Sequence, residues 1–282
     1  KADLKVVTSI KPIHSLSSYI MDGVGSPGLI VDGYNSPHSF QLKPSHAKML
    51  EQADIIFWIG EDLENFLEKP LATIAKKAEK IELLEIKGIK KLKFRERNIF
   101  EEHECHDDHG DDAKKEEHDD HGHHAKKEEH DEHGHGEYDP HIWLDPINAK
   151  VILNEITEHL IENDSKNAST YKSNLAKALA KIDKLIIDVI TETNTDLSYV
   201  VFHDAYQYYE NRFNVNILGA MTVNPDVMPG AEQIHEIHEV IEHDNVSCIL
   251  SEPQFNPDII KSIAKDTSVK TGVLDPLGAN LK

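Results

Sequence analysis

The sequence has few cysteines, few basic residues and no long apolar run. Two cysteines among 282 residues exclude both a disulfide framework and a cysteine-rich zinc site. Cys105 lies in a polar tract and Cys248 in an apolar one, so we expect no disulfide between them. Without about 18 consecutive apolar residues, no membrane-spanning helix is predicted. Thirty basic against 51 acidic residues leave a formal charge of −21, which argues against a nucleic-acid partner.

Strand-like and helix-like stretches alternate along the chain, which predicts an α/β protein with mostly parallel sheets and flanking helices. The length favours two lobes, because a single core seldom grows beyond this size. The expected strands are residues 4–10, 29–31, 54–59, 80–84, 199–202, 215–218, 246–250 and 269–274. The expected helices include residues 15–21, 45–52, 206–212, 231–243 and 257–265.

The middle of the chain predicts a helical connection. Residues 148–193 contain no glycine or proline, and apolar side chains recur at helical spacing in their second part. We therefore predict one long helix over about residues 168–193. Such a rigid helix would restrict the motion of the lobes more than a Gly/Ser linker does. The expected organisation is a first lobe over 1–165, a linking helix over 166–194 and a second lobe over 195–282.

One segment fits neither lobe. Residues 101–137 hold ten of the nineteen histidines, sixteen acidic residues and no aliphatic side chain larger than alanine, partly as a twelve-residue repeat. Because there is almost nothing to bury, we expect a disordered loop. Imidazoles interleaved with carboxylates favour Zn²⁺, Cu²⁺ and Ni²⁺, so the loop indicates metal capture. The alternative is a solvated low-complexity insertion whose histidines have no selected role.

Three other histidines lie in settings of a different kind. His38 lies in a proline-bracketed loop after a predicted strand, His203 stands where a strand ends and a helix begins, and His141 follows the histidine-rich loop. Ligands of open α/β sheets bind at the carboxyl ends of strands, where His38 and His203 are expected. Each alone could be a capping or core-edge residue. Together, in a chain with a metal-collecting loop, they predict a metal site.

Carboxylates at other strand ends could complete that site. Asp275 and three imidazoles would form a four-coordinate shell that suits Zn²⁺. Alternatively, its side chain caps an Asp-Pro turn. Glu252 is better suited to orienting an imidazole through its second nitrogen. Asp145 and Asp204 could do the same, or could simply be turn residues.

The ordered motifs resemble those of the zinc-specific substrate-binding proteins of bacterial ABC importers, the ZnuA type, within a wider zinc- and manganese-binding cluster. The likeness extends from residue 9 to the C-terminus, and the ordered set is far more specific than any single motif. Besides the histidine-rich insertion, it rests on PHSFQLKPS at 37–45, DPHIWLDP at 139–146, FHDAY at 202–206, EPQF at 252–255 and LDPLG at 274–278.

The resemblance implies a non-enzymatic, monomeric periplasmic carrier that delivers Zn²⁺ to an inner-membrane ABC permease. His38 and His141 would hold the ion from the first lobe and His203 from the second. Manganese-binding relatives are expected to have a carboxylate at the third position, so His203 favours zinc. In zinc-binding members the fourth position varies among water, a carboxylate and another histidine, which leaves Asp275 open.

The two chain ends bear on the same interpretation. Lys1 is followed at once by a strand-like stretch, as expected of a mature chain after removal of a signal peptide, although a trimmed chain would look the same. Family members usually have a further helix after the LDPLG motif, and many pair a cysteine like Cys248 with one in that helix. The sequence stops at Lys282 without such a helix. The disulfide of Cys248 is therefore in doubt for this form of the chain.

Functions from other classes use some of the same residues. Three histidines and a water also form a catalytic zinc shell, but a hydrolase needs a general base, and no HExxH motif is present. His235 and His238 lie three apart on a predicted helix, where acidic neighbours indicate a solvated face. A manganese-binding or adhesin-like protein, or a metal buffer that works through the histidine-rich loop, is the remaining alternative.

Overall fold

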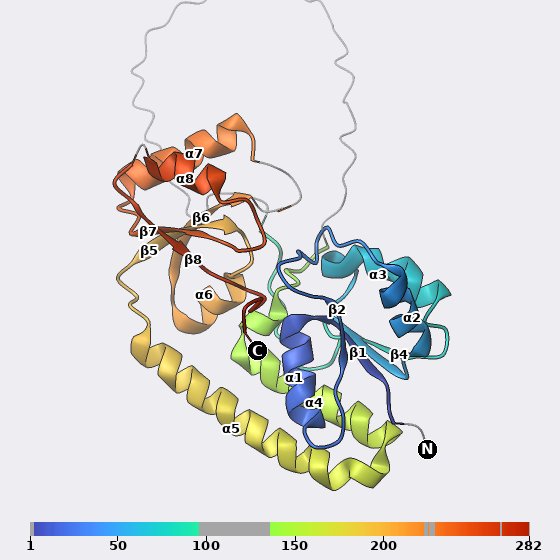
Figure 1. Ribbon diagram of the computed structural model, residues 1–282. Coiled ribbons are helices and arrows are strands. Elements are labelled where there is room, and N and C mark those ends of the chain that lie inside the picture. The colour runs from blue at the N-terminus through green and yellow to red at the C-terminus, as the bar shows by residue number, and fades with distance from the viewer. Residues whose placement is uncertain (1–2, 96–135, 223–224, 226–228, 266, 282) are drawn as a thin grey trace, which may run out of the picture.

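Two four-stranded parallel sheets form the framework of the protein in a computed structural model (Figure 1). The structure describes residues 3–95, 136–222, 225, 229–265 and 267–281. The disorder predicted for residues 101–137 therefore falls outside the described residues, apart from the last two positions. The strand orders are β2-β1-β3-β4 and β6-β5-β7-β8. The predicted α/β class with two lobes of parallel sheet is confirmed.

The first sheet is covered on both faces. Its central strands β1 and β3 are buried at every position, as parallel strands between helices should be. Helices α1 and α4 lie on one side and α2 and α3 on the other (Figure 1). The elements are β1 Val6–Ile10, α1 Lys11–Met21, β2 Gly28–Val31, α2 Pro44–Gln52, β3 Ile55–Trp58, α3 Glu61–Thr73, β4 Glu79–Glu82, η1 Ile142–Leu144, α4 Pro146–Asn163 and η2 Ser165–Asn167.

The second sheet has α7 and α8 on one face and α6 on the other (Figure 1). Cys248 begins β7, is half-buried and carries no disulfide within the described part of the chain. The elements are β5 Ser198–His203, α6 Gln207–Phe213, β6 Asn216–Thr222, α7 Ala231–His243, β7 Cys248–Ser251, α8 Asp258–Lys265 and β8 Lys270–Val273.

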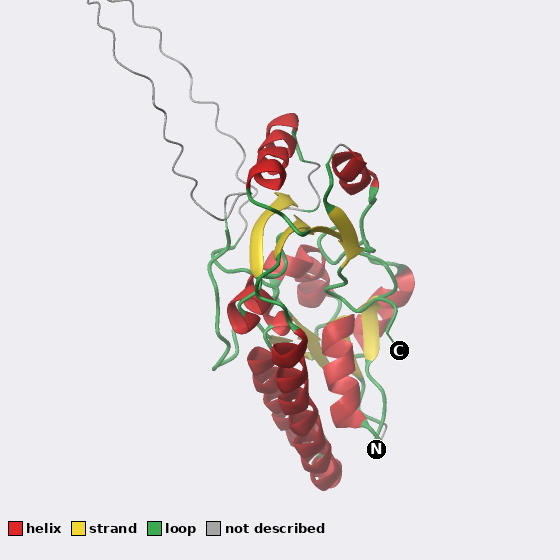
Figure 2. Cartoon of the chain, turned by 90° about the vertical axis from the view of Figure 1, so that its left-hand side faces the viewer, coloured by secondary structure: helices red, strands yellow, loops and turns green. Residues whose placement is uncertain are grey.

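The predicted linking helix is α5, Ala168–Glu192, which runs from the first lobe to the second. Leu175, Leu179 and Ile182 pack against the first core, whereas Ile187 and Ile190 further along are exposed. In the turned view of Figure 2, the long helices α4 and α5 lie at the opposite end of the molecule from α7 and α8. None of the described helices, α5 included, is long and apolar enough to cross a membrane.

A buried carboxylate lies where β3 ends. Glu64 is fully buried and accepts hydrogen bonds from the backbone N–H groups of Ile59 and Gly60, each at 3.0 Å. Burial raises the pKa of Glu64 to about 7, and the two hydrogen bonds oppose this shift only in part. The sequence analysis did not single out this residue.

The raised pKa makes the stability of the fold depend on pH. Below about pH 4.5 both the folded and unfolded chains hold the Glu64 proton. The folded state then has its full stabilisation from the tighter binding of this proton, on the order of 3 kcal/mol. It is lost as pH rises through about 7. We therefore expect Glu64→Gln, which cannot ionise, to gain stability relative to the unmodified chain between pH 4.5 and 7. Urea unfolding across this range measures the difference, and parallel curves would contradict the assignment.

Candidate metal centre

Three histidines from distant parts of the sequence meet between the two lobes. The ring centroids of His38 and His141 are 5.5 Å apart, those of His38 and His203 are 5.0 Å apart, and those of His141 and His203 are 4.9 Å apart. One nitrogen from each ring lies within 4.8 Å of the others. The structure thus brings together three of the four residues predicted to bind metal.

Each ring is positioned by a different kind of element. His38 lies in the loop between β2 and α2, where its backbone N–H donates to Oγ of Ser36 at 3.3 Å. His141 immediately precedes the short 3-10 helix η1, and His203 is the last residue of β5. His141 and His203 are each 3% exposed, whereas His38 is half-buried. The strand-end position expected for His203 is therefore confirmed.

The orientation of His141 is set by Asp139. The Nδ1 atom of His141 lies 2.7 Å from Oδ1 of Asp139, and the same oxygen accepts the His141 backbone N–H at 2.9 Å. Both side chains are almost completely buried. A carboxylate at Nδ1 holds the proton on that nitrogen and leaves Nε2 with its lone pair for a metal.

The two ring nitrogens of His203 are buried, and neither has a hydrogen-bond partner among the described residues. Oε1 of Glu252 lies 3.6 Å from Nδ1 of His203, too far for a hydrogen bond. The Glu252 carboxylate is held by the hydroxyl of Tyr206, which donates to Oε1 at 2.9 Å. Burial and the neighbouring Glu252 charge raise the pKa of Tyr206, so this hydroxyl stays a donor. A bound cation would satisfy one of these two nitrogens and balance the buried Glu252 carboxylate.

The space beside the three rings is small. Its volume is about 10 Å³, which is close to the room that one water needs. The walls are formed largely by apolar side chains, among them Trp143, Phe255 and Leu277. The indole N–H of Trp143 donates to the backbone oxygen of Pro276 at 2.8 Å and joins the lobes at this wall. The cavity fits a single ion or water.

Asp275 lies outside the group of three histidines. Its Oδ1 accepts from Nε2 of Gln254 at 2.9 Å and from the backbone N–H groups of Leu277 and Gly278 at 3.1 and 3.0 Å. Its Oδ2 accepts from the backbone N–H of Ala279 at 2.6 Å. The carboxylate therefore caps the turn that forms one wall of the cavity, which was the alternative considered for this residue.

Asp145 and Asp204, which the sequence analysis considered as orienting groups, both pair with arginines. Asp145 caps the start of α4 and accepts from Nε and Nη2 of Arg212 at 2.8 and 2.7 Å. Asp204 pairs with Arg95. Both pairs join residues of the first lobe to residues of the second, so both contribute to the interface between the lobes.

A second group of potential metal ligands lies on the outer side of the first lobe. Glu79, His159 and Glu162 have ligand atoms within 4.8 Å of one another. Both ring nitrogens of His159 already face carboxylates, Nδ1 at 2.8 Å from Glu79 and Nε2 at 3.2 Å from Glu155. His235 is exposed and pairs with Glu239 on α7, as expected of a solvated face, whereas His238 is half-buried.

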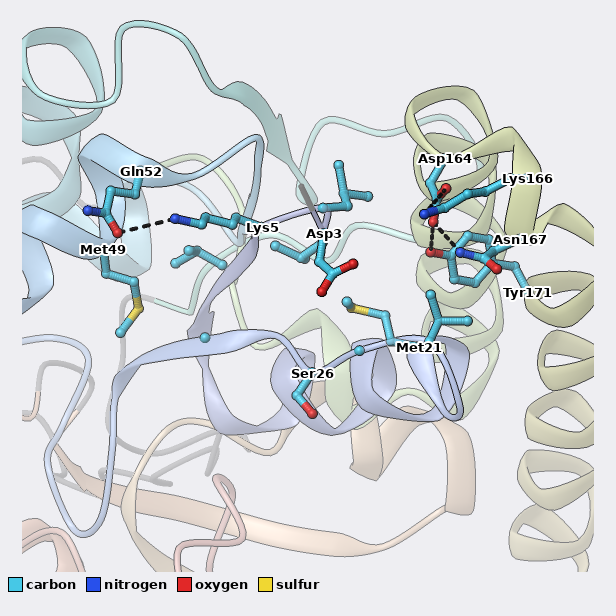
Figure 3. A pocket seen from close by; sticks show the side chains of 16 residues that line it. Asp3, Lys5, Met21, Ser26, Met49, Gln52, Asp164, Lys166, Asn167 and Tyr171 are labelled. Atoms are coloured by element: carbon cyan, nitrogen blue, oxygen red, sulfur yellow. Dashed lines mark hydrogen bonds and ion pairs between the residues drawn. The ribbon is translucent and has the colours of Figure 1, made fainter. Parts of the chain in front are cut away.

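A larger cavity within the described part of the chain lies elsewhere. It measures about 540 Å³ and lies at the amino end of β1, between α1 and the start of α5 (Figure 3). Two of the polar groups at its edge are already paired. Asp164 accepts from the Tyr171 hydroxyl at 2.9 Å, and Nζ of Lys5, just before β1, donates to the side-chain oxygen of Gln52 at 3.4 Å. Ligand sites of open α/β sheets form at the opposite, carboxyl ends of strands, so the three histidines are the stronger candidate.

Comparison with known proteins points to zinc uptake. The family model of the zinc-uptake complex component A, periplasmic, matches residues 6–282. A high-affinity zinc uptake system protein ZnuA of Brucella abortus is 46% identical over 98% of this chain and 85% of its own length. The protein of the same name from Yersinia pestis is 37% identical over 99% of this chain and 85% of its own.

Solved structures show the same fold. A crystal structure of ZnuA superposes with a TM-score of 0.76 at 22% identity and covers 99% of this chain and 93% of its own. The laminin-binding protein Lmb of Streptococcus agalactiae, described as having adhesin and metal-transporting activity, superposes with a TM-score of 0.73 at 22% identity. The match covers 98% of this chain and 90% of that protein.

Proposed function

The chain belongs to the family of the periplasmic zinc-uptake complex component A, and we propose from this premise that it captures Zn²⁺ between its lobes and delivers the ion to an ABC importer permease. The observation that carries the proposal is the convergence of His38, His141 and His203 on one small cavity. The protein acts in the periplasm as a monomer, and its partner is the inner-membrane permease.

The ligand chemistry supports zinc as the cargo. Three imidazoles suit Zn²⁺, whereas manganese sites are richer in oxygen ligands. Zinc takes four ligands in most protein sites, so three histidines leave one position for a water or a carboxylate. Because the oxygens of Asp275 already accept four hydrogen bonds, we propose water for this position and a turn-capping role for Asp275.

The same cavity disfavours a hydrolase. A zinc hydrolase must place an ester or peptide beside the metal-bound water, and ligand sites of that kind usually measure about 300–1,000 Å³. The space beside the histidines, about 10 Å³, admits only an ion or a water. The family is one of transport proteins, in agreement with a carrier.

The contacts between the lobes support a small movement on metal binding. Side chains tie the lobes together around the site, through Trp143 to Pro276, Arg212 to Asp145 and Lys11 to the Ala279 backbone oxygen at 2.7 Å. We propose a slight tilt of the lobes, because a wide hinge opening would break all of these bonds.

Deletion of residues 101–136 separates a carrier from a metal buffer. We expect the shortened protein to keep one tightly bound zinc per chain, because the three histidines lie outside the deleted segment. Isothermal titration of both proteins with Zn²⁺ gives the number of tight sites. Loss of nearly all zinc binding on deletion would assign capture to the histidine-rich segment and contradict the proposal.

A further inference from the structure

Arg95 joins the two lobes beside the metal centre. Its Nε donates to Oδ2 of Asp204 at 2.9 Å, and its Nη2 donates to the other oxygen of the same carboxylate. Its Nη1 and Nη2 donate to the two carboxylate oxygens of Glu210 at 3.0 and 2.8 Å. Asp204 and Glu210 side chains are only 3% and 12% exposed, so these charge-assisted bonds are largely shielded from water.

Asp204 directly follows His203. Its backbone N–H donates to the Thr222 backbone oxygen at 3.1 Å, which continues the pairing of β5 with β6. With the backbone held by the sheet and the carboxylate held by Arg95, the chain on the C-terminal side of His203 has little freedom. Arg95 therefore restrains the end of the strand from which the His203 ring projects into the site.

Arg95 also belongs to a pair of short antiparallel segments, residues 92–95 and 137–139, which we call the hairpin base. Lys93 pairs with Tyr138 in an antiparallel bridge. The backbone N–H of Phe94 donates to the Glu137 oxygen at 3.1 Å, and that of Asp139 donates to the Leu92 oxygen at 2.9 Å. One segment of the hairpin base thus carries Arg95, and the other ends at Asp139, which orients His141.

Helix α6 holds the hairpin base against the second lobe. The hydroxyl of Tyr208 donates to the Asp139 backbone oxygen at 2.7 Å and accepts the Leu92 backbone N–H at 3.0 Å. Nε2 of Gln207 donates to the Lys93 backbone oxygen at 3.0 Å. Tyr208 is 1% exposed. Both segments of the hairpin base are therefore bonded to the helix that follows His203 in the sequence.

We propose that Arg95 is a positioning residue of the zinc site, which fixes His203 through Asp204 and couples it, through the hairpin base, to Asp139 and His141. The inference rests on the proposed function, because it requires His203 to bind the metal. Without Arg95, two buried carboxylates lose their shared cation. Burial already raises the pKa of Glu210, and the Arg95 charge is what opposes that shift.

The test compares Arg95→Gln with Arg212→Gln in the full chain. Arg212 is a matched control, since it also forms a two-point bond with a buried aspartate across the lobes, Asp145. We expect Arg95→Gln to lower zinc affinity by about 10–100-fold, the usual cost of losing a group that orients a metal ligand, and Arg212→Gln to lower it by less than about 3-fold. Chelator competition gives the affinities, and the visible spectrum of the Co²⁺-loaded proteins reports ligand geometry.

A changed cobalt spectrum in Arg95→Gln alone is the expected result, even where both variants unfold at lower temperature. Equal losses of zinc affinity in the two variants, or an unchanged cobalt spectrum in Arg95→Gln, would overturn the inference. If Arg95→Gln does not fold, Asp204→Asn breaks the same pair from the other side and must show the same loss. Should the unmodified chain bind no zinc at its three histidines, the proposed function fails. If the unmodified chain binds zinc at the three histidines and Arg95→Gln binds it equally well, only the proposed role of Arg95 fails.

Discussion

Replacing His203 by alanine is expected to weaken zinc binding by more than about 100-fold, since loss of a group that merely orients a ligand already costs about 10–100-fold. His203 is buried, and its ring nitrogens have no hydrogen-bond partner among the described residues. The substitution therefore breaks no hydrogen bond of the His203 ring within the described part of the chain. Chelator competition at constant pH measures the loss, and circular dichroism should show an intact fold.

Asp275→Ala is the matched comparison. Its carboxylate caps the turn at residues 275–279, so the substitution should loosen one wall of the cavity and leave all three imidazoles in place. We expect a loss of zinc affinity at least about ten times smaller than that of His203→Ala. Equal losses in the two variants would mean that Asp275 is a full ligand and that the bonds to its backbone partners rearrange around the ion.

Replacing Asp139 by asparagine should lower zinc affinity by about 10–100-fold, the range found for partners of metal-bound histidines. The Asp139 carboxylate holds the Nδ1 proton of His141 and keeps Nε2 free. A neutral amide is a weaker acceptor and does not favour the proton on that nitrogen. The amide has nearly the same size, so packing against the buried His141 ring is preserved. Zinc titration against a competing chelator measures the change.

The control for this substitution is Asp164→Asn at the remote cavity. Asp164 accepts hydrogen bonds from the Tyr171 hydroxyl and from Asn167 at 2.9 and 2.6 Å, in a setting comparable to that of Asp139. Zinc affinity should be the same as in the unmodified chain. If Asp164→Asn and Asp139→Asn weaken zinc binding alike, a general loss of stability is responsible, and the orienting role of Asp139 would have to be abandoned.

Most of the framework could be predicted because the central strands of the first sheet, β1 and β3, are buried at every position. The run at 55–58 is apolar throughout, and the helical spacing of Leu175, Leu179 and Ile182 predicted α5. Strand ends were less well defined: the expected strand over residues 4–10 begins at Val6 in the structure. Glu64 and helix α3 were not singled out, since acidic residues and Pro70 interrupt the apolar pattern there.

The three histidines could be predicted from their places at strand and loop ends, but their supporting groups could not. Arg95 contacts a carboxylate 109 positions away, and no local pattern indicates such a pairing. Asp139 lies two residues before His141, and that close spacing was the available signal. Asp275 has the residue type and strand-end position of a ligand. Only the packing of the turn reveals where its oxygens are bound.

A crystal of the full chain grown with Zn²⁺, with anomalous diffraction recorded on both sides of the zinc edge, tests the central claim most directly. The account predicts one strong peak between the lobes, about 2.0–2.1 Å from a ring nitrogen of each of His38, His141 and His203, with Nε2 as the ligand atom of His141. A principal peak elsewhere, or rings that do not share the ion, would contradict it.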